Sequence, residues 1–267
     1  MSKLPRHEEE LLRTAVLGVP RTQLLAAPEL TTTQAEELAA LVARRKAGEP
    51  LQYIIGRAPF RYLELAVTPD VLIPRPETET LVQLVIDWWE ETKGTRDGDG
   101  DAQVLDVGTG SGAIAIALAS EVGVRLVATD ISAPALALAE ENAAAAGVAQ
   151  LVDFVLCDVC EGIVGPFDVL VSNPPYVTSA QMSELPAEIA EWEPHQALDG
   201  GTDGLDVLRK IVPAAKLLLR PGGLLALELE EDNVRQAAAL LDDAWTAVNV
   251  HQDLTGRERF LTATRAR

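Results

Sequence analysis

Cysteine and histidine are scarce in this sequence of 267 residues. Its two cysteines, Cys157 and Cys160, belong to one short stretch, while the three histidines are scattered along the chain. A zinc site would need a second cysteine pair or nearby histidines. A redox-active pair should open a helix, whereas this one closes a strand-like run at residues 151–156. The sequence therefore predicts two reduced thiols and no metal site.

Positive charge and long apolar runs are also limited. Against 41 Asp and Glu there are 22 Lys and Arg, which gives a formal net charge of −19. This excess disfavours broad adhesion to phosphate backbones, so we expect no stable nucleic-acid partner. No uncharged apolar run reaches the roughly 18 residues that a membrane span needs, and the first residues lack the apolar core of a signal peptide. We therefore expect a cytoplasmic protein without membrane association, acting as a monomer.

Apolar residues nevertheless make up 48% of the chain, and their spacing divides it into three parts. Up to about Gly48 they recur at helical spacing, with a capping segment at 31–33. From Phe60 the period is two, with a turn at 68–70, which predicts a β-hairpin ending at Ile73. We place the boundaries at a helical domain over 1–58, a hairpin linker over 59–74 and a larger domain over 75–267.

Strand and helix patterns alternate through the larger domain. Strands are expected at 104–107, 125–129, 151–156, 167–171, 224–229, 245–250 and 259–264. Helices are expected at 113–121, 134–146, 205–219 and 232–241. A turn at 221–223 should precede the fifth strand, and residues 94–101, rich in Gly and Asp, should form a surface loop. This alternation predicts an α/β fold with a doubly wound sheet, whose ligands bind beyond the carboxyl ends of the strands.

A glycine-rich loop stands between the first of these strands and the following helix. Its residues are Gly108, Thr109, Gly110, Ser111 and Gly112. Glycines let the chain turn tightly and let a ligand touch backbone N–H groups at a helix N-terminus. The loop by itself fits NAD as well as S-adenosylmethionine. The third glycine, an acidic residue before the loop and the lack of a hydride-transfer acid favour S-adenosylmethionine.

Two carboxylates follow the next two strands of the larger domain. Asp130 lies about 20 residues beyond the loop, where an acid that binds ribose hydroxyls is expected. Asp158 closes the third strand and can face an adenine. Either residue can instead cap a loop.

A second motif, Asn173-Pro174-Pro175-Tyr176, follows the apolar run at 167–171. The side-chain carbonyl of Asn173 and the backbone carbonyl of Pro174 can hold both N–H bonds of a planar NH2 group and aim its nitrogen at an electrophile. The prolines stiffen the loop, and Tyr176 can stack on the planar group. A bare Asn-Pro-Pro is usually just a turn. The preceding strand, the following aromatic residue and the upstream glycine loop favour a catalytic role here.

From Gly48 to about Thr264 the sequence resembles the HemK/PrmC family, the methyltransferases that modify the glutamine side-chain nitrogen of peptide chain release factors. An Asn-Pro-Pro-Tyr motif alone is shared with amino-methyltransferases of DNA and RNA. The stretch Arg-Pro-Glu-Thr-Glu at 75–79 makes the resemblance much more specific. The other segments that carry it are 50–53, 56–57, 106–112, 193–194 and 197–201.

The resemblance implies a seven-stranded class I methyltransferase domain over 75–267, with S-adenosyl-L-methionine as its cofactor. It also implies that the helical domain over 1–58 docks the release factor. Gly108 to Gly112, Asp130 and Val159 would line the cofactor together with Asn173, and Asn173 to Tyr176 would grip the glutamine of a Gly-Gly-Gln motif. The chain departs from the family pattern at Val159, where some members carry an aromatic residue, and at 228–230, which replaces a glycine-ended turn.

Four other interpretations remain. One is the same chemistry on a ribosomal-protein glutamine, and another is an amino-methyltransferase acting on adenine or guanine in nucleic acid, which the acidic charge disfavours. The third is an NAD-binding oxidoreductase, and the fourth is a scaffold that binds a nucleotide without catalysis.

Overall fold

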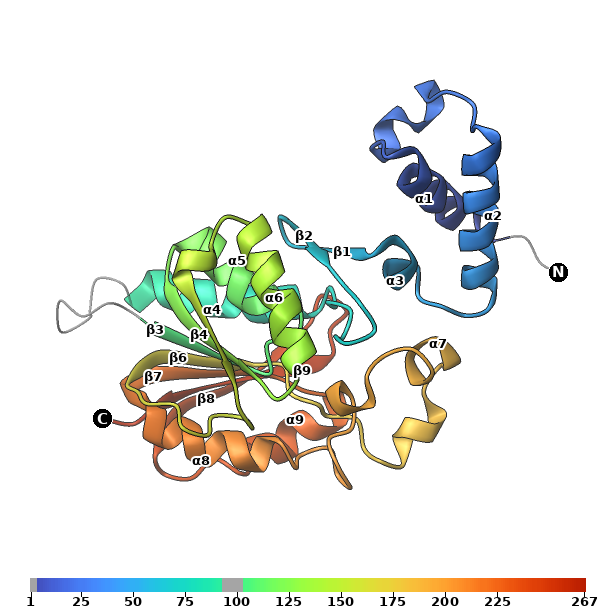
Figure 1. The fold of residues 1–267 in the computed structure, drawn as a ribbon. Coiled ribbons are helices and arrows are strands. Elements are labelled where there is room, and N and C mark those ends of the chain that lie inside the picture. Colours follow the sequence, from blue (N-terminus) through green and yellow to red (C-terminus); the bar gives the residue numbers. More distant parts are fainter. Residues whose placement is uncertain (1–3, 93–102) are drawn as a thin grey trace.

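The computed structural model describes residues 4–92 and 103–267 (Figure 1). The surface loop predicted at 94–101 lies outside these residues. The ribbon shows a small group of N-terminal helices standing apart from a larger α/β body, with a two-stranded hairpin between them. None of the described helices is long and apolar enough to cross a membrane.

The N-terminal part consists of α1 (Arg6–Leu17), the 3-10 segment η1 (Arg21–Ala26), α2 (Thr32–Lys46) and the short α3 (Leu51–Ile55). The predicted cap is confirmed, because the Thr31 side chain accepts a hydrogen bond from the backbone of Gln34 in a capping box. Arg45, near the end of α2, pairs with Glu8 at 2.9 Å and with Glu188 of α7 (Ala187–Ala190) at 3.0 Å. These pairs tie α1, α2 and the larger body together.

The hairpin forms earlier in the chain than its sequence pattern predicts. Its strands are β1 (Arg57–Phe60) and β2 (Leu63–Ala66), so the predicted strand through Phe60 to Val67 and a second strand at 71–73 are wrong. The chain turns at Arg61, whose φ is 50°. Its backbone N–H donates to Glu79 and its guanidinium to Glu121. These contacts hold a left-handed backbone conformation at a position where the sequence has no glycine, asparagine or aspartate to predict a turn. The predicted turn at 68–70 does form, but no strand follows it.

Seven strands form the main sheet, in the order β5-β4-β3-β6-β7-β9-β8. Within it, β9 is antiparallel to both of its neighbours and the other pairings are parallel. The chain order reverses between β3 and β6, which is where a doubly wound sheet opens a ligand crevice. The predicted fold class is confirmed. The strands are β3 (Gln103–Val107), β4 (Arg125–Asp130), β5 (Val152–Leu156), β6 (Phe167–Ser172), β7 (Leu219–Glu228), β8 (Trp245–Gln252) and β9 (Glu258–Arg265).

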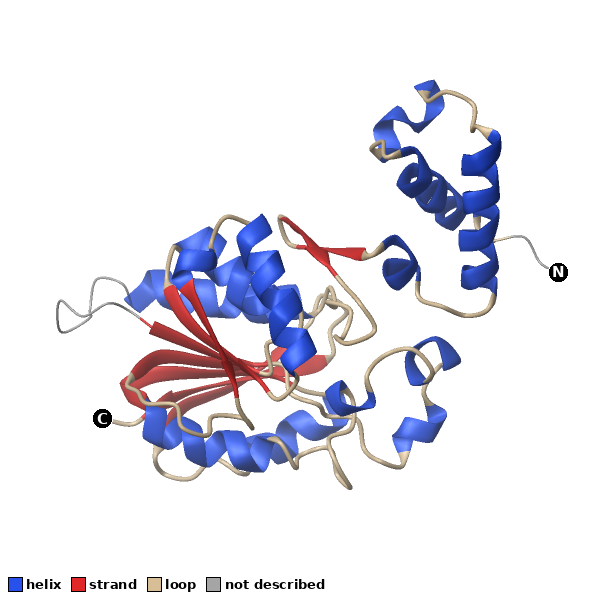
Figure 2. Cartoon of the chain, viewed as in Figure 1, coloured by secondary structure: helices blue, strands red, loops and turns tan. Residues whose placement is uncertain are grey.

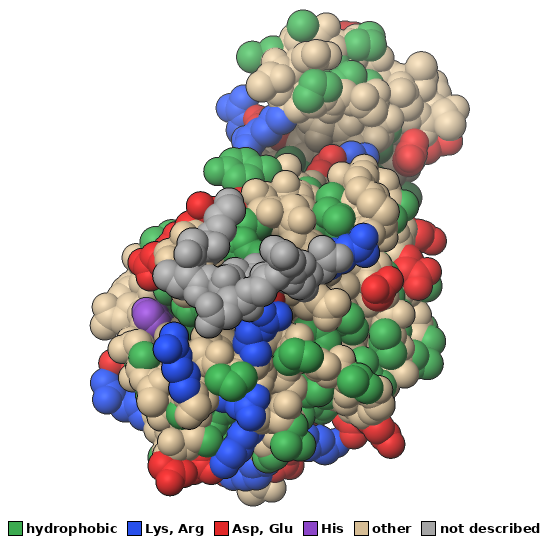
Figure 3. All heavy atoms as spheres, turned by 90° about the vertical axis from the view of Figure 1, so that its left-hand side faces the viewer, with side chains coloured by type: hydrophobic (Ala, Val, Ile, Leu, Met, Phe, Trp, Pro, Cys, Tyr) green, Lys and Arg blue, Asp and Glu red, His purple; other side chains and the backbone are tan. Residues whose placement is uncertain are grey.

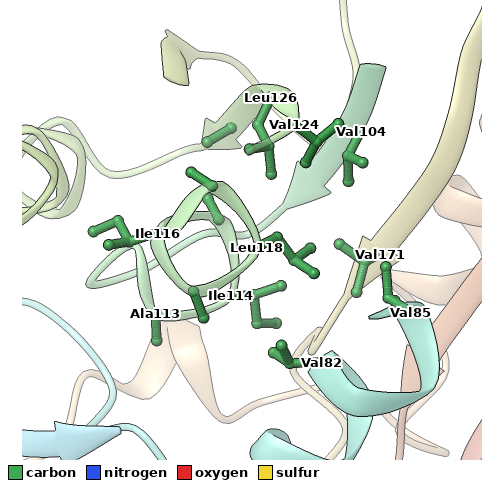
Figure 4. Close-up of a cluster of buried hydrophobic side chains, with 14 of the residues drawn as sticks. Val82, Val85, Val104, Ala113, Ile114, Ile116, Leu118, Val124, Leu126 and Val171 are labelled. Carbon is green, nitrogen blue, oxygen red and sulfur yellow. The ribbon is translucent and has the colours of Figure 1, made fainter. Parts of the chain in front are cut away.

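Helices cover both faces of the sheet (Figure 2). On one face lie α4 (Thr78–Thr92), α5 (Ala113–Val122) and α6 (Ala133–Ala145), and on the other α8 (Leu208–Leu218) and α9 (Glu231–Ala238). Residues 113–119 of α5 are all apolar and all buried, as expected for a helix that is covered on every side over this length. Its Ile114 and Leu118 lie between Val82 of α4 and the strands (Figure 4). This packing fixes the N-terminal end of α5, where the glycine loop ends.

The turn predicted at 221–223 is instead absorbed into β7. The strand starts at Leu219, which pairs with Phe167, and pairing resumes only at Leu224 with Val169. The residues between them form a bulge opposite Asp168, with Gly222 at a φ of 83°. The glycines therefore interrupt the pairing without ending the strand.

The long connection from β6 to α8 begins with the Asn-Pro-Pro-Tyr motif. It continues through η3 (Gln181–Glu184), α7 and η4 (His195–Ala197), and a further 3-10 segment, η2 (Ala149–Leu151), precedes β5. Figure 3 views the molecule from the opposite end of the sheet, and in this view a separate lobe rises above the larger body. On that face basic side chains gather toward the middle and acidic ones toward the rim, so the negative charge is unevenly spread.

Candidate active site

A cavity of about 520 Å³ opens beyond the carboxyl ends of β3, β4 and β6. Every predicted cofactor residue lines it except Gly112. The connection between the hairpin and α4, residues 70–78, and the segment 194–199 close its remaining sides. The cavity therefore lies at the switch point of the sheet, where the alternating pattern places a ligand.

The glycine loop exposes its backbone to this cavity. Gly108, Gly110 and Gly112 all have positive φ. A Cβ added to Gly108 or Gly110 would meet nothing within 4 Å, whereas one on Gly112 would lie 2.7 Å from Ile116 Cδ1. The first two glycines thus leave room for a ligand, and the third permits close packing of α5. The backbone N–H groups of Gly108 and Thr109 donate to Thr129 O, which fixes the loop to β4.

Asp106, which precedes the loop, is completely buried. Its Oδ2 accepts a hydrogen bond from the Thr109 hydroxyl at 2.7 Å, and its Oδ1 has no partner among the described residues. Burial raises the pKa of this carboxyl to about 7, against the lowering effect of the Thr109 hydrogen bond. Asp106 does not line the cavity, and it acts on the loop through its hydrogen bond with Thr109.

Asp130 performs the loop-capping role that the sequence left open, and it also lines the cavity. Its Oδ2 accepts from the backbone of Gly110 at 2.8 Å and its Oδ1 from that of Ser132 at 2.9 Å. Ser132 also caps α6, because its side chain accepts from the backbone N–H of Ala135. A carboxylate has about four acceptor positions, so Asp130 keeps capacity for a ligand hydroxyl.

Asp158 and Val159 form the far wall of the cavity. Asp158 is paired with Lys210 of α8 at 2.6 Å, and both side chains are well exposed. Val159 has a φ of 55°, which is a strained conformation for a β-branched residue. Its carbonyl accepts from the Thr129 hydroxyl at 2.7 Å, and this bond helps to hold the strained turn. The neighbouring Cys157 and Cys160 are free thiols, as predicted, and burial raises the pKa of Cys160 to about 12.

Asn173 lies between the first cavity and a second, smaller one of about 230 Å³. Its Nδ2 donates to Thr78 Oγ1 at 3.2 Å, and no described residue donates to its Oδ1. Pro174 also lines both cavities, Pro175 lines the first and Tyr176 the second. The motif is therefore a partition with one face toward each cavity.

Glycines from the segment after the motif press against it. A Cβ on Gly200 would lie 2.7 Å from Pro175 O, and one on Gly204 would lie 2.3 Å from Tyr176 O. Asn233 of α9 donates to Tyr176 O at 3.0 Å. Burial raises the pKa of the Tyr176 hydroxyl, so its proton stays in place at neutral pH. The partition is thereby held from several sides.

The second cavity draws on side chains that the sequence analysis did not assign to the site. Arg75 donates to both oxygens of Glu193, at 2.7 and 2.8 Å, and so joins two of the motifs that carried the family resemblance. Thr78 and Lys210 of the first cavity, and Glu228 of the second, were also missed. The Arg-Pro-Glu-Thr-Glu stretch was the available signal for Arg75 and Thr78.

Comparison with known proteins assigns the chain to a family. Residues 2–56 match the family described as PrmC N-terminal domain, and residues 95–192 match Methyltransferase small domain. The release factor glutamine methyltransferases of Moorella thermoacetica and Deinococcus radiodurans are each 41% identical to it, over 98% of this chain and 92% of theirs. The chain belongs to the release factor glutamine methyltransferase family. A solved methyltransferase from Pyrococcus furiosus shares the fold, with a TM-score of 0.54 and 21% identity over 84% of this chain and all of that one.

Family membership confirms the predicted enzyme class, a methyltransferase that uses S-adenosyl-L-methionine. The NAD-binding oxidoreductase and the non-catalytic scaffold are thereby excluded. The residues present fit this cofactor. Space left open by Gly108 and Gly110 suits a ligand that touches backbone N–H groups, and Asp130 at the cavity wall suits ribose hydroxyls.

Proposed function

We propose that this chain transfers a methyl group from S-adenosyl-L-methionine to the side-chain amide nitrogen of the glutamine in the Gly-Gly-Gln motif of peptide chain release factors. The single observation that carries the proposal is the position of Asn173. Its carboxamide lies between two cavities, and its Oδ1 is left without a donor from the described residues. An unengaged acceptor at this point suits an incoming NH2 group.

In this proposal the first cavity holds the cofactor, which supplies an electrophilic methyl group on its sulfonium. The backbone of Gly108 to Ser111 would hold the amino-acid part, with Gly112 giving the loop its close packing. Asp130 would accept from the ribose hydroxyls, and Asp158 and Val159 would hold the adenine. Asn173 and Pro174 close the cavity at the reacting end.

The acceptor glutamine enters the second cavity. Asn173 Oδ1 and the Pro174 carbonyl accept its two N–H bonds and direct the nitrogen toward the first cavity. Pro175 keeps these carbonyls in place, and Tyr176 packs on the planar amide. The bound cofactor would supply the methyl group, its C–S bond breaking as the N–C bond to the glutamine forms, and the nitrogen would release one proton. These acceptors matter most as positive charge develops on the nitrogen.

The wider organisation follows the same proposal. Residues 1–58 dock the release factor, residues 59–74 link the two parts, and residues 75–267 carry catalysis. We propose a cytoplasmic, monomeric enzyme whose partner is a protein and which keeps no nucleic acid bound. The ion pairs of Arg45 with Glu8 and Glu188 support a fixed placement of the docking domain beside the second cavity.

Mass spectrometry tests this function directly. Purified release factors, ribosomal proteins and RNA are incubated separately with the enzyme and a donor whose methyl group carries deuterium. We expect label on the glutamine of the Gly-Gly-Gln motif, and none after that glutamine is replaced by asparagine. Label on a ribosomal protein or on RNA, with none on release factors, would refute the proposed substrate.

A further inference from the structure

Asn142 of α6 is a buried carboxamide that lies outside both cavities. Its side chain belongs to a residue that is only 3% exposed. The Oδ1 atom accepts from the backbone N–H of Ala66 at 2.8 Å, and Nδ2 donates to Ala66 O at 3.0 Å and to Ser111 O at 2.9 Å. The carbonyl and both N–H bonds of the carboxamide are thus used. One buried side chain thereby joins the end of the hairpin to the glycine loop.

The glycine loop is held from two sides. Backbone N–H groups of residues 108–110 donate to Thr129 and Asp130 at the end of β4. Ser111, the next residue, is held from the side of α6 by Asn142. Ser111 lines the first cavity and stands between two glycines with positive φ. Because glycines leave the backbone many accessible conformations, such a loop depends on its hydrogen bonds to stay in one of them.

The hairpin is attached to α5 and α6, the two helices beside this loop. At its turn, the guanidinium of Arg61 donates to both carboxylate oxygens of Glu121 of α5, at 2.5 and 2.6 Å. At the end of β2, Ala66 is held by Asn142 of α6. α6 also shares a buried apolar cluster with α3 and β1. A shift of the hairpin therefore acts on the helices that support the cofactor loop.

We propose that Asn142 is a positioning residue that couples the hairpin to the cofactor loop. This inference rests on the proposed place of the cofactor in the first cavity, and it is independent of which acceptor is methylated. A cofactor that needs the loop in its ordered form binds best while Asn142 holds Ser111 O. The same side chain then also holds Ala66. Because coupling between two sites is reciprocal, bound cofactor should in turn stabilise the hairpin that leads to the helical domain.

Three variants test the coupling. Asn142→Ala removes all three hydrogen bonds and introduces a residue that suits a helix. Asn142→Asp keeps the acceptor for the Ala66 N–H but removes the donors for the two carbonyls. Asn233→Ala is the matched control, because it removes a carboxamide that is 4% exposed and that donates to Tyr176 O rather than to the glycine loop. Affinity for the demethylated form of the cofactor is measured by calorimetry, beside thermal melts.

We expect both Asn142 variants to bind the demethylated cofactor about tenfold more weakly, because each loses the hydrogen bond that holds Ser111. Asn233→Ala should lose thermal stability and keep the wild-type affinity. A purely structural Asn142 would give variants that melt earlier and yet bind as tightly as Asn233→Ala does. That result overturns the proposal.

Hydrogen exchange followed by mass spectrometry tests the coupling in the wild type, without any variant. Residues 63–66 of β2 line neither cavity, so the cofactor does not cover them. We expect the demethylated cofactor to slow amide exchange both in the loop at 108–112 and in β2, and to lose its effect on β2 in Asn142→Ala. Slower exchange in the loop with unchanged exchange in β2 overturns the coupling. Tight binding that leaves the exchange of the loop unchanged contradicts the proposed place of the cofactor instead.

Discussion

The two cavities that meet at Asn173 are built in different ways. The first has one wall made by the consecutive residues 108–111 and by carboxylates at the ends of the neighbouring strands, while the segments 70–78 and 194–199 close its remaining sides. The second is assembled from side chains of the separate segments 72–77, 173–177, 185–198, 228–230 and Arg259. The loop wall of the first cavity depends on local conformation, whereas the second cavity depends throughout on the packing of distant segments. Variants of the two should therefore fail in different ways.

The largest effect is expected where both cavities share a wall. Asn173→Ala removes the acceptor for the substrate N–H and should lower kcat about 100- to 1,000-fold, since this contact strengthens as charge develops on the nitrogen. Cofactor affinity should change little. Single-turnover methylation, calorimetry and thermal melts separate these effects, with the exposed Asn249→Ala as a matched control. Parallel loss of stability and cofactor binding would reduce Asn173 to a turn residue.

A change confined to the first cavity should affect the cofactor alone. Asp130→Ala removes the carboxylate that accepts from Gly110 and Ser132, and with it the acceptor for ribose. We expect cofactor binding to weaken by roughly 1.5 to 3 kcal/mol, measured by calorimetry. Asp153→Ala, which alters an exposed carboxylate of β5, should leave the affinity unchanged. Equal weakening in both variants would show a nonspecific charge effect.

A change confined to the second cavity should alter the pH dependence of stability. The pKa of Glu228 is raised from 4.5 to about 7, so between these values the folded protein binds more protons than the unfolded chain. The contribution of Glu228 to the free energy of unfolding therefore falls as pH rises through this window. We expect Glu228→Gln to be more stable than wild type by roughly 2 kcal/mol at pH 8, and to match it at pH 4.5. Urea unfolding at both pH values measures this, and a constant difference would contradict it.

The smallest effect is expected away from both cavities. Arg45→Ala breaks the ion pairs that tie α2 to Glu8 and to Glu188 of α7, a helix that contributes Ile189 to the wall of the second cavity. We expect a loss of about 1 kcal/mol in acceptor binding, seen as a several-fold higher KM with kcat preserved. Arg57→Ala breaks an exposed pair with Glu64 and should leave KM unaltered. If the KM is also unaltered in Arg45→Ala, the Arg45 ion pairs have no role in docking the acceptor.

The same contrast decides how much of the site could be predicted from the sequence. Gly108 to Gly112 are consecutive, and their function depends on local turns, so the pattern alone located the first cavity. Asn173 to Tyr176 could be found because they follow a buried strand. Thr78 and Glu228 could not be assigned to the site, because only the packing of α4 on β7 brings these residues, 150 positions apart in the chain, to neighbouring cavities.

The fold shows a similar division. The helix cap at Thr31 and the order of strands and helices follow local signals and are confirmed. The hairpin was misplaced because its turn at Arg61 is held by Glu79 and Glu121, which lie on other elements. The glycines at 222 and 223 form a bulge because β6 supplies pairing on both sides of them. Tertiary contacts decide each of these cases.

The central claim is that each reactant has its own cavity, and filling one of them tests it most directly. Leu185 lines the second cavity and not the first. Leu185→Trp should raise the KM for the release factor strongly while leaving the cofactor dissociation constant at the wild-type value. The exposed control Leu217→Trp should leave both constants at their wild-type values. Weaker cofactor binding in Leu185→Trp, or acceptor kinetics like those of wild type, would contradict the claim.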